Sequence, residues 1–127
     1  MGELYVLLNK MKPIPKELNL DRLVGQMLQQ ICIGPNDLQF RFEGDDRISC
    51  EGCVSVTLAG IHHEIFTEDG WSDISPLSGI VGQIVESWRV DSPNVLQVIL
   101  APATILSFTS SDSAYEDFVV DPEALVW

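Results

Sequence analysis

Apolar and polar residues alternate along LQFRF (38–42), where one leucine and two phenylalanines are separated by a glutamine and an arginine. A period of two residues is typical of a strand with one buried face. The following EGDD (43–46) has the composition of a turn, and RISC (47–50) resumes the apolar pattern. The pattern therefore predicts a β-hairpin over residues 38–50.

The same arrangement of residues occurs twice in the chain. LVGQMLQQICI begins at Leu23 and IVGQIVESWRV begins at Ile80, and each is followed by a proline–asparagine pair and then by leucine–glutamine. About 30 residues recur at a spacing of 57 to 58. The match predicts a duplication, with repeats that cover approximately residues 20–66 and 77–121.

The two V-G-Q segments fit two interpretations. Their apolar residues have helical spacing, with Asp21 and Ser78 as candidate N-caps. A glycine within the pattern weakens a continuous helix, and β-branched residues follow it in the second copy. We therefore expect one helical turn that ends near Gly25 or Gly82, and then a strand through QICIG or VESWRVD.

The remaining segments also favour strands. CVSVTLAGIHHEIF alternates and breaks at Ala59-Gly60, which predicts another hairpin. TEDGWSDISPLSG is expected to be a loop, AYEDFVVDP a last strand, and ELYVLL near the N-terminus an edge strand. The predicted fold is mainly β: a single antiparallel β domain of about eight strands, with a pseudo-two-fold internal repeat and short helical turns. The alternative is an α+β fold.

Length and composition agree with one globular domain. The chain has 127 residues, of which 46% are hydrophobic and 20% are charged. No apolar stretch reaches the ~20 residues that a membrane span needs, and the N-terminus lacks the features of a secretory signal. Three cysteines are an odd number and fit reduced thiols rather than a disulfide framework. We therefore expect a cytoplasmic protein.

Charge is distributed unevenly along the chain. The 19 acidic and 7 basic residues give a net charge of −12, and Arg89 is the only basic residue after Arg47. Such a field repels nucleic acid and anionic lipid and attracts basic partners. This predicts a basic protein partner and neither nucleic-acid nor membrane binding. The alternative is that the acids serve solubility alone.

A family resemblance rests on the second half of the chain. The order L-x-x-I-V-G-Q-x-V-x-S, a hairpin, and then FTSSDSAYEDFVV resembles small two-repeat bacterial domains of unknown function found in toxin-immunity neighbourhoods. The resemblance covers residues 77–121 well and the first half loosely, because HHEIFTED stands where a second Y-E-D-F would be expected. It implies an immunity-type role.

The CEGC segment is the sharpest local chemical signal. Cys50 and Cys53 have a spacing used for metal or redox sites, and His62 and His63 follow. Adjacent residues of a strand point to opposite faces, so both histidines cannot readily bind one metal ion. We therefore favour structural cysteines and expect no metal and no cofactor. The sequence also lacks the serine-elbow and phosphate-loop motifs, so we expect no catalytic residues.

Two segments combine acidic and aromatic residues. One carries acids around Trp71 and the other carries acids around Tyr115. Aromatic side chains anchor protein interfaces, and complementary charge accelerates association. The alternative is that both aromatics belong to the core. The predicted partner-binding residues are Glu68, Asp69, Trp71, Asp73, Asp112, Tyr115, Glu116 and Asp117.

These observations predict a non-catalytic acidic binding protein rather than an enzyme. The specific hypothesis is a bacterial immunity protein that neutralises a basic, nuclease-type toxin by covering its cationic active site. Two alternatives stay open. One is a homodimeric structural or assembly module, and the other is a small metal-binding protein that uses Cys50, Cys53 and His62.

Overall fold

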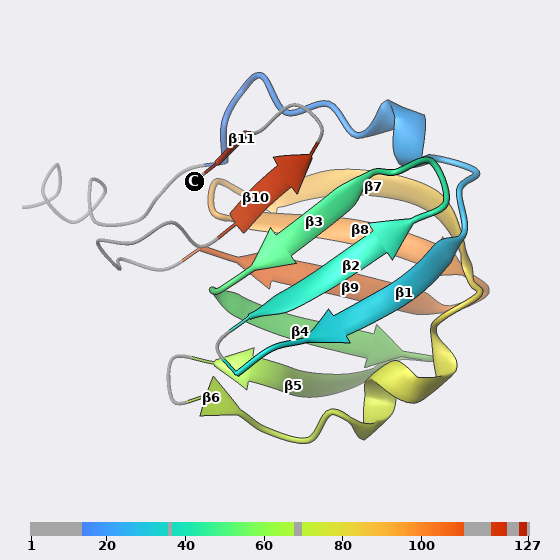
Figure 1. Cartoon of the computed structure of the whole chain (residues 1–127), viewed down its shortest axis with the longest axis vertical. Helices are drawn as coiled ribbons and strands as arrows, with labels where there is room; N and C mark the ends of the chain where they lie inside the picture. The colour runs from blue at the N-terminus through green and yellow to red at the C-terminus, as the bar shows by residue number, and fades with distance from the viewer. Residues whose placement is uncertain (1–13, 36, 68–69, 111–117, 122–124, 127) are drawn as a thin grey trace, which may run out of the picture.

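A computed structural model describes residues 14–35, 37–67, 70–110, 118–121 and 125–126 of the chain. These residues form two antiparallel sheets that pack face to face (Figure 1). The first sheet has the strand order β1-β2-β3-β10-β11, and the second has the order β6-β5-β4-β9-β8-β7. The prediction of a mainly β, antiparallel fold with short helical turns is confirmed, and the α+β alternative is wrong.

The elements follow one another as the repeat predicts, with two additions. Eleven strands lie in the described residues, because the two-residue strands β6 and β11 add to the predicted set. β6 lies in the segment that was expected to be a loop. The strands are β1 (Leu28–Ile33), β2 (Leu38–Phe42), β3 (Arg47–Cys50), β4 (Cys53–Leu58), β5 (Ile61–Thr67), β6 (Gly70–Trp71), β7 (Ile84–Ser92), β8 (Val95–Ala101), β9 (Thr104–Thr109), β10 (Phe118–Asp121) and β11 (Leu125–Val126), and the 3-10 turns are η1 (Asp21–Leu23) and η2 (Ser75–Gly79). The expected N-terminal strand ELYVLL lies outside the described residues.

The core lies between the two sheets. Alternate residues of β2, β8 and β9 are buried, as the period of two predicts. Phe40 of β2 and Phe108 of β9 meet across the interface, with ring centroids 5.4 Å apart and an interplanar angle of 85°. This edge-to-face contact is a preferred geometry for aromatic pairs, and it joins the two sheets at the centre.

Each V-G-Q segment forms a tight corner rather than a continuous helix. A 3-10 turn ends shortly before the glycine, and the strand begins shortly after it. Gly25 and Gly82 have φ angles of 90° and 98°, in the left-handed region that side chains with a Cβ rarely adopt. The glycine therefore ends the turn and redirects the chain into a strand. This confirms the preferred interpretation of these segments.

The two corners hold each other through reciprocal backbone hydrogen bonds. Each bond given by one copy is matched by the equivalent bond from the other. They run from Gly25 N–H to Val85 O (2.8 Å), from Gly82 N–H to Leu28 O (2.8 Å), from Leu28 N–H to Gln83 O (2.9 Å) and from Val85 N–H to Gln26 O (2.9 Å). Between them, Met27 and Ile84 form an antiparallel bridge. Reciprocal contacts of this kind define a two-fold relation, and its axis passes near this bridge.

The two halves of the chain exchange strands. β4 follows β3 in sequence but pairs with β9, whereas β10 follows β9 but pairs with β3. Val56 faces Leu106 in one sheet as Val120 faces Ile48 in the other. The structural equivalent of β10 is therefore β4, and not the HHEIFTED segment with which the sequence pattern compared it.

No helix in the described part of the chain is both long enough and apolar enough to span a membrane.

Candidate binding surface at one end of the sheets

Successive turns lie at opposite ends of the two sheets. The turn between β1 and β2, the link between β3 and β4, and the turn between β7 and β8 lie together, at the left of Figure 1. The pairing register shows why: Thr109 faces both Cys53 and Val95, and Leu38 faces Cys50. We call this the acidic end and define it by residues 34–35, 37, 51–52 and 91–94.

Described acids at this end have few basic neighbours in the turns. Asp37 is half-buried, whereas Glu51 and Asp91 are exposed, and no arginine lies in these turns. Lys16 is two residues from Ile14, whose N–H donates to Pro93 O (2.7 Å), but the exposed Glu17 follows it directly. Among the described residues of the acidic end, acids therefore outnumber bases.

The opposite end has a different balance. The turn between β2 and β3 carries Glu43, Asp45 and Asp46. Arg41 and Arg47 lie in these two strands next to the turn, and Arg22 lies in η1. Arginines are thus interspersed among the acids at this end, whereas no arginine lies in the turns of the acidic end.

Most of the predicted partner-binding residues lie outside the part of the chain that the structure describes. This applies to Glu68, Asp69, Asp112, Tyr115, Glu116 and Asp117. The backbone of Trp71 lies in β6 and pairs with Phe66, and Asp73 is exposed in the segment between β6 and η2. The structure therefore does not place the eight residues relative to one another.

The structure places the two strand ends that precede the acid–aromatic segments in the sequence. Phe66 of β5 faces Val54 of β4, and Val54 also faces Phe108 of β9. β5 and β9 are both antiparallel to β4, so both run toward the acidic end. At a strand spacing of about 4.8 Å, residues 68 and 111 follow strand ends that are ~10 Å apart.

The Asp73 carboxylate has a local structural role. Its Oδ1 accepts a hydrogen bond from Ser75 N–H (2.9 Å) at the start of η2. The backbone hydrogen bond from Ser75 lowers the pKa of Asp73, and the Ser75 side chain and the nearby His63 lower it further. Asp73 is exposed, so its charge stays available to a partner while one oxygen caps the turn.

The geometry does not support the metal-site alternative. Cys50 is buried in the core from β3, and burial raises the pKa of its thiol, with a further contribution from Asp37. Cys53 lies in the second sheet, on the face of β4 opposite to the buried Val54 and Val56. Among the described residues, no three histidine, cysteine, aspartate or glutamate side chains converge on one point.

A shallow hollow of about 430 Å³ lies on the outer face of the second sheet. Its side chains bond to one another: His62 Nε2 lies 2.9 Å from Glu64 Oε1, and Gln97 Nε2 donates to Ser107 Oγ (3.2 Å). The lining residues are Cys53, Val54, Ser55, Thr57, His62, Glu64, Gln97, Ser107 and Thr109. His62 and Cys53 were candidates from the sequence, but the sequence pattern does not predict that serine and threonine side chains line the same hollow.

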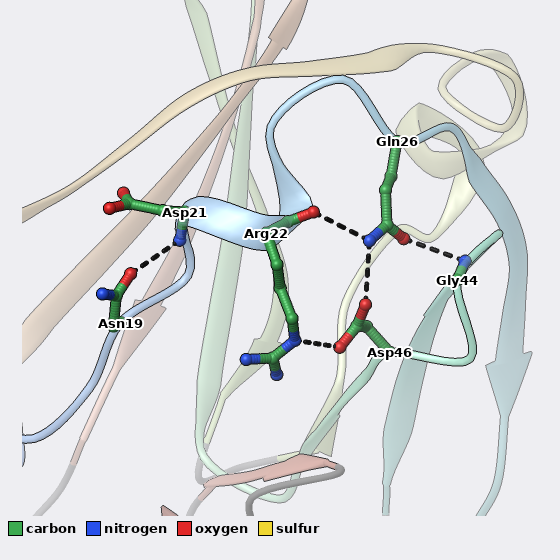
Figure 2. A network of polar contacts seen from close by, with 6 residues as sticks. All are labelled: Asn19, Asp21, Arg22, Gln26, Gly44 and Asp46. Atoms are coloured by element: carbon green, nitrogen blue, oxygen red, sulfur yellow. Dashed lines mark hydrogen bonds and ion pairs between the residues drawn. The ribbon is translucent and has the colours of Figure 1, made fainter.

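A polar network stabilises the first V-G-Q corner (Figure 2). Gln26 Nε2 donates to Arg22 O (2.8 Å) and to Asp46 Oδ2 (2.8 Å), and Gln26 Oε1 accepts from Gly44 N–H (2.9 Å). Arg22 forms an ion pair with the other oxygen of Asp46, whose exposed fraction is 4%. The network fastens the turn between β2 and β3 to the corner. The feature of the sequence that points to this network is the glutamine that both V-G-Q segments share.

Comparisons with protein-family models, with curated proteins and with solved structures give no match.

Proposed function

We propose that this protein is a non-catalytic acidic binding protein that recognises a basic protein partner at its acidic end. The proposal rests on two features that are found together at the acidic end: described acids with few basic neighbours, and the ends of β5 and β9. Asp37, Glu51 and Asp91 lie at this end, and β5 and β9 both run toward it immediately before the two acid–aromatic segments.

The partner class follows from charge. A protein of net charge −12 attracts cationic surfaces over distances of about a Debye length and repels nucleic acid. Nuclease clefts are cationic because they bind phosphates. A bacterial nuclease-type toxin is therefore the partner that we favour. The carboxylates cover its cleft in place of the nucleic-acid backbone, and Trp71 and Tyr115 anchor the contact. The resemblance to immunity-neighbourhood domains supports the same choice.

The test compares two pairs of neutralising substitutions that change the net charge equally. Asp69→Asn with Glu116→Gln acts on the acid–aromatic segments, and Asp45→Asn with Glu86→Gln acts at the opposite end. The ligand is the C-terminal domain of any secreted protein encoded immediately upstream. We expect the first pair to raise Kd by ~10-fold or more and the control pair by less than ~3-fold, with binding that weakens as salt rises.

Equal effects of the two pairs would show that only net charge matters, and the acidic end would then not be the binding surface. Binding that does not respond to salt would remove the electrostatic mechanism. If the upstream domain does not bind at all and is not inhibited, the immunity role is wrong.

A homodimeric module is the second candidate, because exposed apolar residues gather at the two corners. Val24, Met27, Val81 and Ile84 are all more than one-third exposed, and Met27 pairs with Ile84 at the two-fold axis. Apolar side chains that face water favour association. Sedimentation equilibrium distinguishes the candidates: a stable dimer that Met27→Gln disrupts supports the module, and a monomer excludes it.

A further inference from the structure

We propose that the outer face of the second sheet binds a neutral ligand rich in hydroxyl groups, of the saccharide class. The site is the hollow of about 430 Å³ on this face, which is within the usual size range of small-ligand sites. The hollow shares no residue with the acidic end. The inference therefore goes beyond the proposed basic partner and can be tested separately from it.

Short and long side chains give the hollow its shape. Ser55 of β4 and Ser107 of β9 face each other on adjacent strands and form its floor. Longer side chains stand on the flanking strands, with His62 and Glu64 on β5 and Gln97 on β8. The backbones of β5 and β8 lie about 14 Å apart, because three strand spacings of ~4.8 Å separate them. The hollow is therefore a trough with a floor of hydroxyl groups between two polar walls.

One row of facing residues crosses this face from β7 to β5. The row reads Arg89, Gln97, Ser107, Ser55 and Glu64. Arg89 Nε donates to Gln97 Oε1 (2.6 Å), and Gln97 Nε2 donates to Ser107 Oγ (3.2 Å). The donors in this row thus all point the same way, from the guanidinium group on β7 toward the carboxylate on β5.

The row is interrupted between Ser107 and Glu64. Ser107 Oγ already accepts a hydrogen bond, so its own proton is left to donate. Within the described part of the chain, the hydroxyl groups of Ser55 and Thr57 form no hydrogen bond, and Glu64 is contacted by His62. A group that accepts from Ser107 and donates to Glu64 completes the row. A hydroxyl group can do both, because it carries one donor and two acceptor sites.

The first sheet shows that the fold does not require these hydroxyl groups. β10 is the structural equivalent of β4, and Val119 faces Ser49 as Ser55 faces Ser107. Valine therefore stands at the position of Ser55 in the other sheet. A strand of this kind can be built without the hydroxyl group.

Charge makes a neutral ligand the best fit. Among the described residues, the hollow is lined by one carboxylate, Glu64, and by no lysine or arginine. An anion would meet this carboxylate and the field of a protein of net charge −12. A cation would meet a carboxylate that is 54% exposed and already close to His62, so water screens the attraction.

Hydrogen bonds would carry most of the recognition. No phenylalanine, tyrosine or tryptophan is among the described residues that line the hollow. A saccharide has hydroxyl groups on adjacent carbon atoms and can replace several bound waters without losing their hydrogen bonds. We expect weak binding, with a Kd of about 1–10 mM, because each exchanged hydrogen bond contributes little net free energy.

The experiment titrates the full chain with maltotriose and with cellotriose, two neutral saccharides that differ in linkage, and follows amide chemical shifts by NMR. Tetraethylene glycol dimethyl ether is the reference ligand, because its oxygens accept hydrogen bonds but cannot donate them. The test variant is Ser55→Val with Thr57→Val, which removes two hydroxyl groups and keeps residues that favour strands. Ser49→Val is the control, because Ser49 lies on the outer face of the first sheet at the position equivalent to Ser107.

We expect saturable shifts confined to β4, β5, β8 and β9 in the natural protein and in Ser49→Val, and a Kd at least ~5-fold higher in the double variant. Saturation by either saccharide supports the proposal, and a difference between the two identifies the preferred linkage. Thermal denaturation should show that the double variant is as stable as the natural protein, because neither hydroxyl group has a partner in the described fold. Equal saccharide responses in the double variant, saturable shifts of the same residues with the ether, or saturation by neither saccharide would overturn the proposal.

Discussion

Gln26 and Gln83 occupy the same position in the two V-G-Q corners, yet only one of them has all its hydrogen bonds. In both corners, Nε2 donates to a backbone oxygen four residues earlier, at 2.8 Å for Gln26 and 3.4 Å for Gln83. Gln26 Oε1 accepts from Gly44 N–H, whereas Gln83 Oε1 is buried without a hydrogen-bond partner among the described residues.

The residues around the two glutamines explain the difference. In the repeat, Pro102 stands at the position of Gly44, and proline has no N–H to donate. Thr104 stands at the position of Asp46, so no carboxylate reaches Gln83 Nε2. Both corners nevertheless adopt the same backbone path. The turn and its glycine therefore determine the corner, and the polar network adds stability to the first copy only.

The largest expected effect comes from Asp46→Asn, which removes the charge that holds Arg22 while keeping the shape of the side chain. Asp46 is almost fully buried, so we expect a loss of about 2 kcal/mol in the free energy of unfolding. Asp45→Asn in the same turn is the control and should cost less than about 0.5 kcal/mol, because Asp45 is exposed. Urea denaturation measures both. Equal losses would mean that the network contributes nothing.

The two glutamines allow a matched comparison. Gln26→Leu leaves the Asp46 carboxylate and the Gly44 N–H each without one partner, and we expect a loss of about 1–2 kcal/mol. Gln83→Leu removes a buried acceptor that has no partner, so its cost should be near zero or negative. The same unfolding measurement tests the pair. A larger loss at Gln83 would contradict this account of the second corner.

The glycines should behave alike, because the turn is common to both corners. Gly25→Ala and Gly82→Ala each place a Cβ in the left-handed region, at an expected cost of about 1 kcal/mol. An added Cβ meets no described atom within 4 Å at either position, so backbone strain is the sole cause. Thermal denaturation of the two variants should give closely similar shifts in Tm, and a clear difference would show that the corners are not equivalent.

The smallest effect concerns the residues that precede the two 3-10 turns. Asn19 Oδ1 accepts from Asp21 N–H, and Asp73 Oδ1 accepts from Ser75 N–H, each at 2.9 Å. The pKa of Asp73 is lowered in the folded protein, so its contribution to stability is present above the ordinary pKa of 3.8 and is lost as the pH falls through the folded value. Asn19 has no such dependence.

Asp73→Asn should therefore remove a small acid-dependent part of the stability, whereas Asn19→Ser should leave the pH profile unchanged in shape. Unfolding measured between pH 3 and pH 6 compares them. An NMR titration that gives Asp73 a pKa at or above 3.8 would contradict the expected direction.

Local pattern was sufficient to predict the hairpins and the corners. Alternation identified β2 and β3, and a glycine within an apolar run identified the change from turn to strand. The strand exchange could not be predicted, because it depends on which distant strands pair. The link from β9 to β10 is also longer than the link from β3 to β4, so the match between β4 and β10 falls outside the 57 to 58 residue spacing.

For the candidate surfaces too, the sequence predicts the residue types, and only the strand pairing shows how they are arranged. Composition identified the acids and the aromatics, but only the pairing of Phe66, Val54 and Phe108 shows that two acidic segments begin at neighbouring strand ends. The residues of the polar row on the second sheet were visible in the sequence as ordinary alternate positions. Their alignment across five strands required the register.

The exchange of β4 and β10 has a consequence for how the molecule comes apart. Neither half of the chain forms a complete sheet by itself. β3 pairs with β10 from the second half, and β9 pairs with β4 from the first half. If either half unfolds, a strand in the other half loses one of its paired neighbours. The protein should therefore lose its structure in a single all-or-none step, with no half surviving as an intermediate.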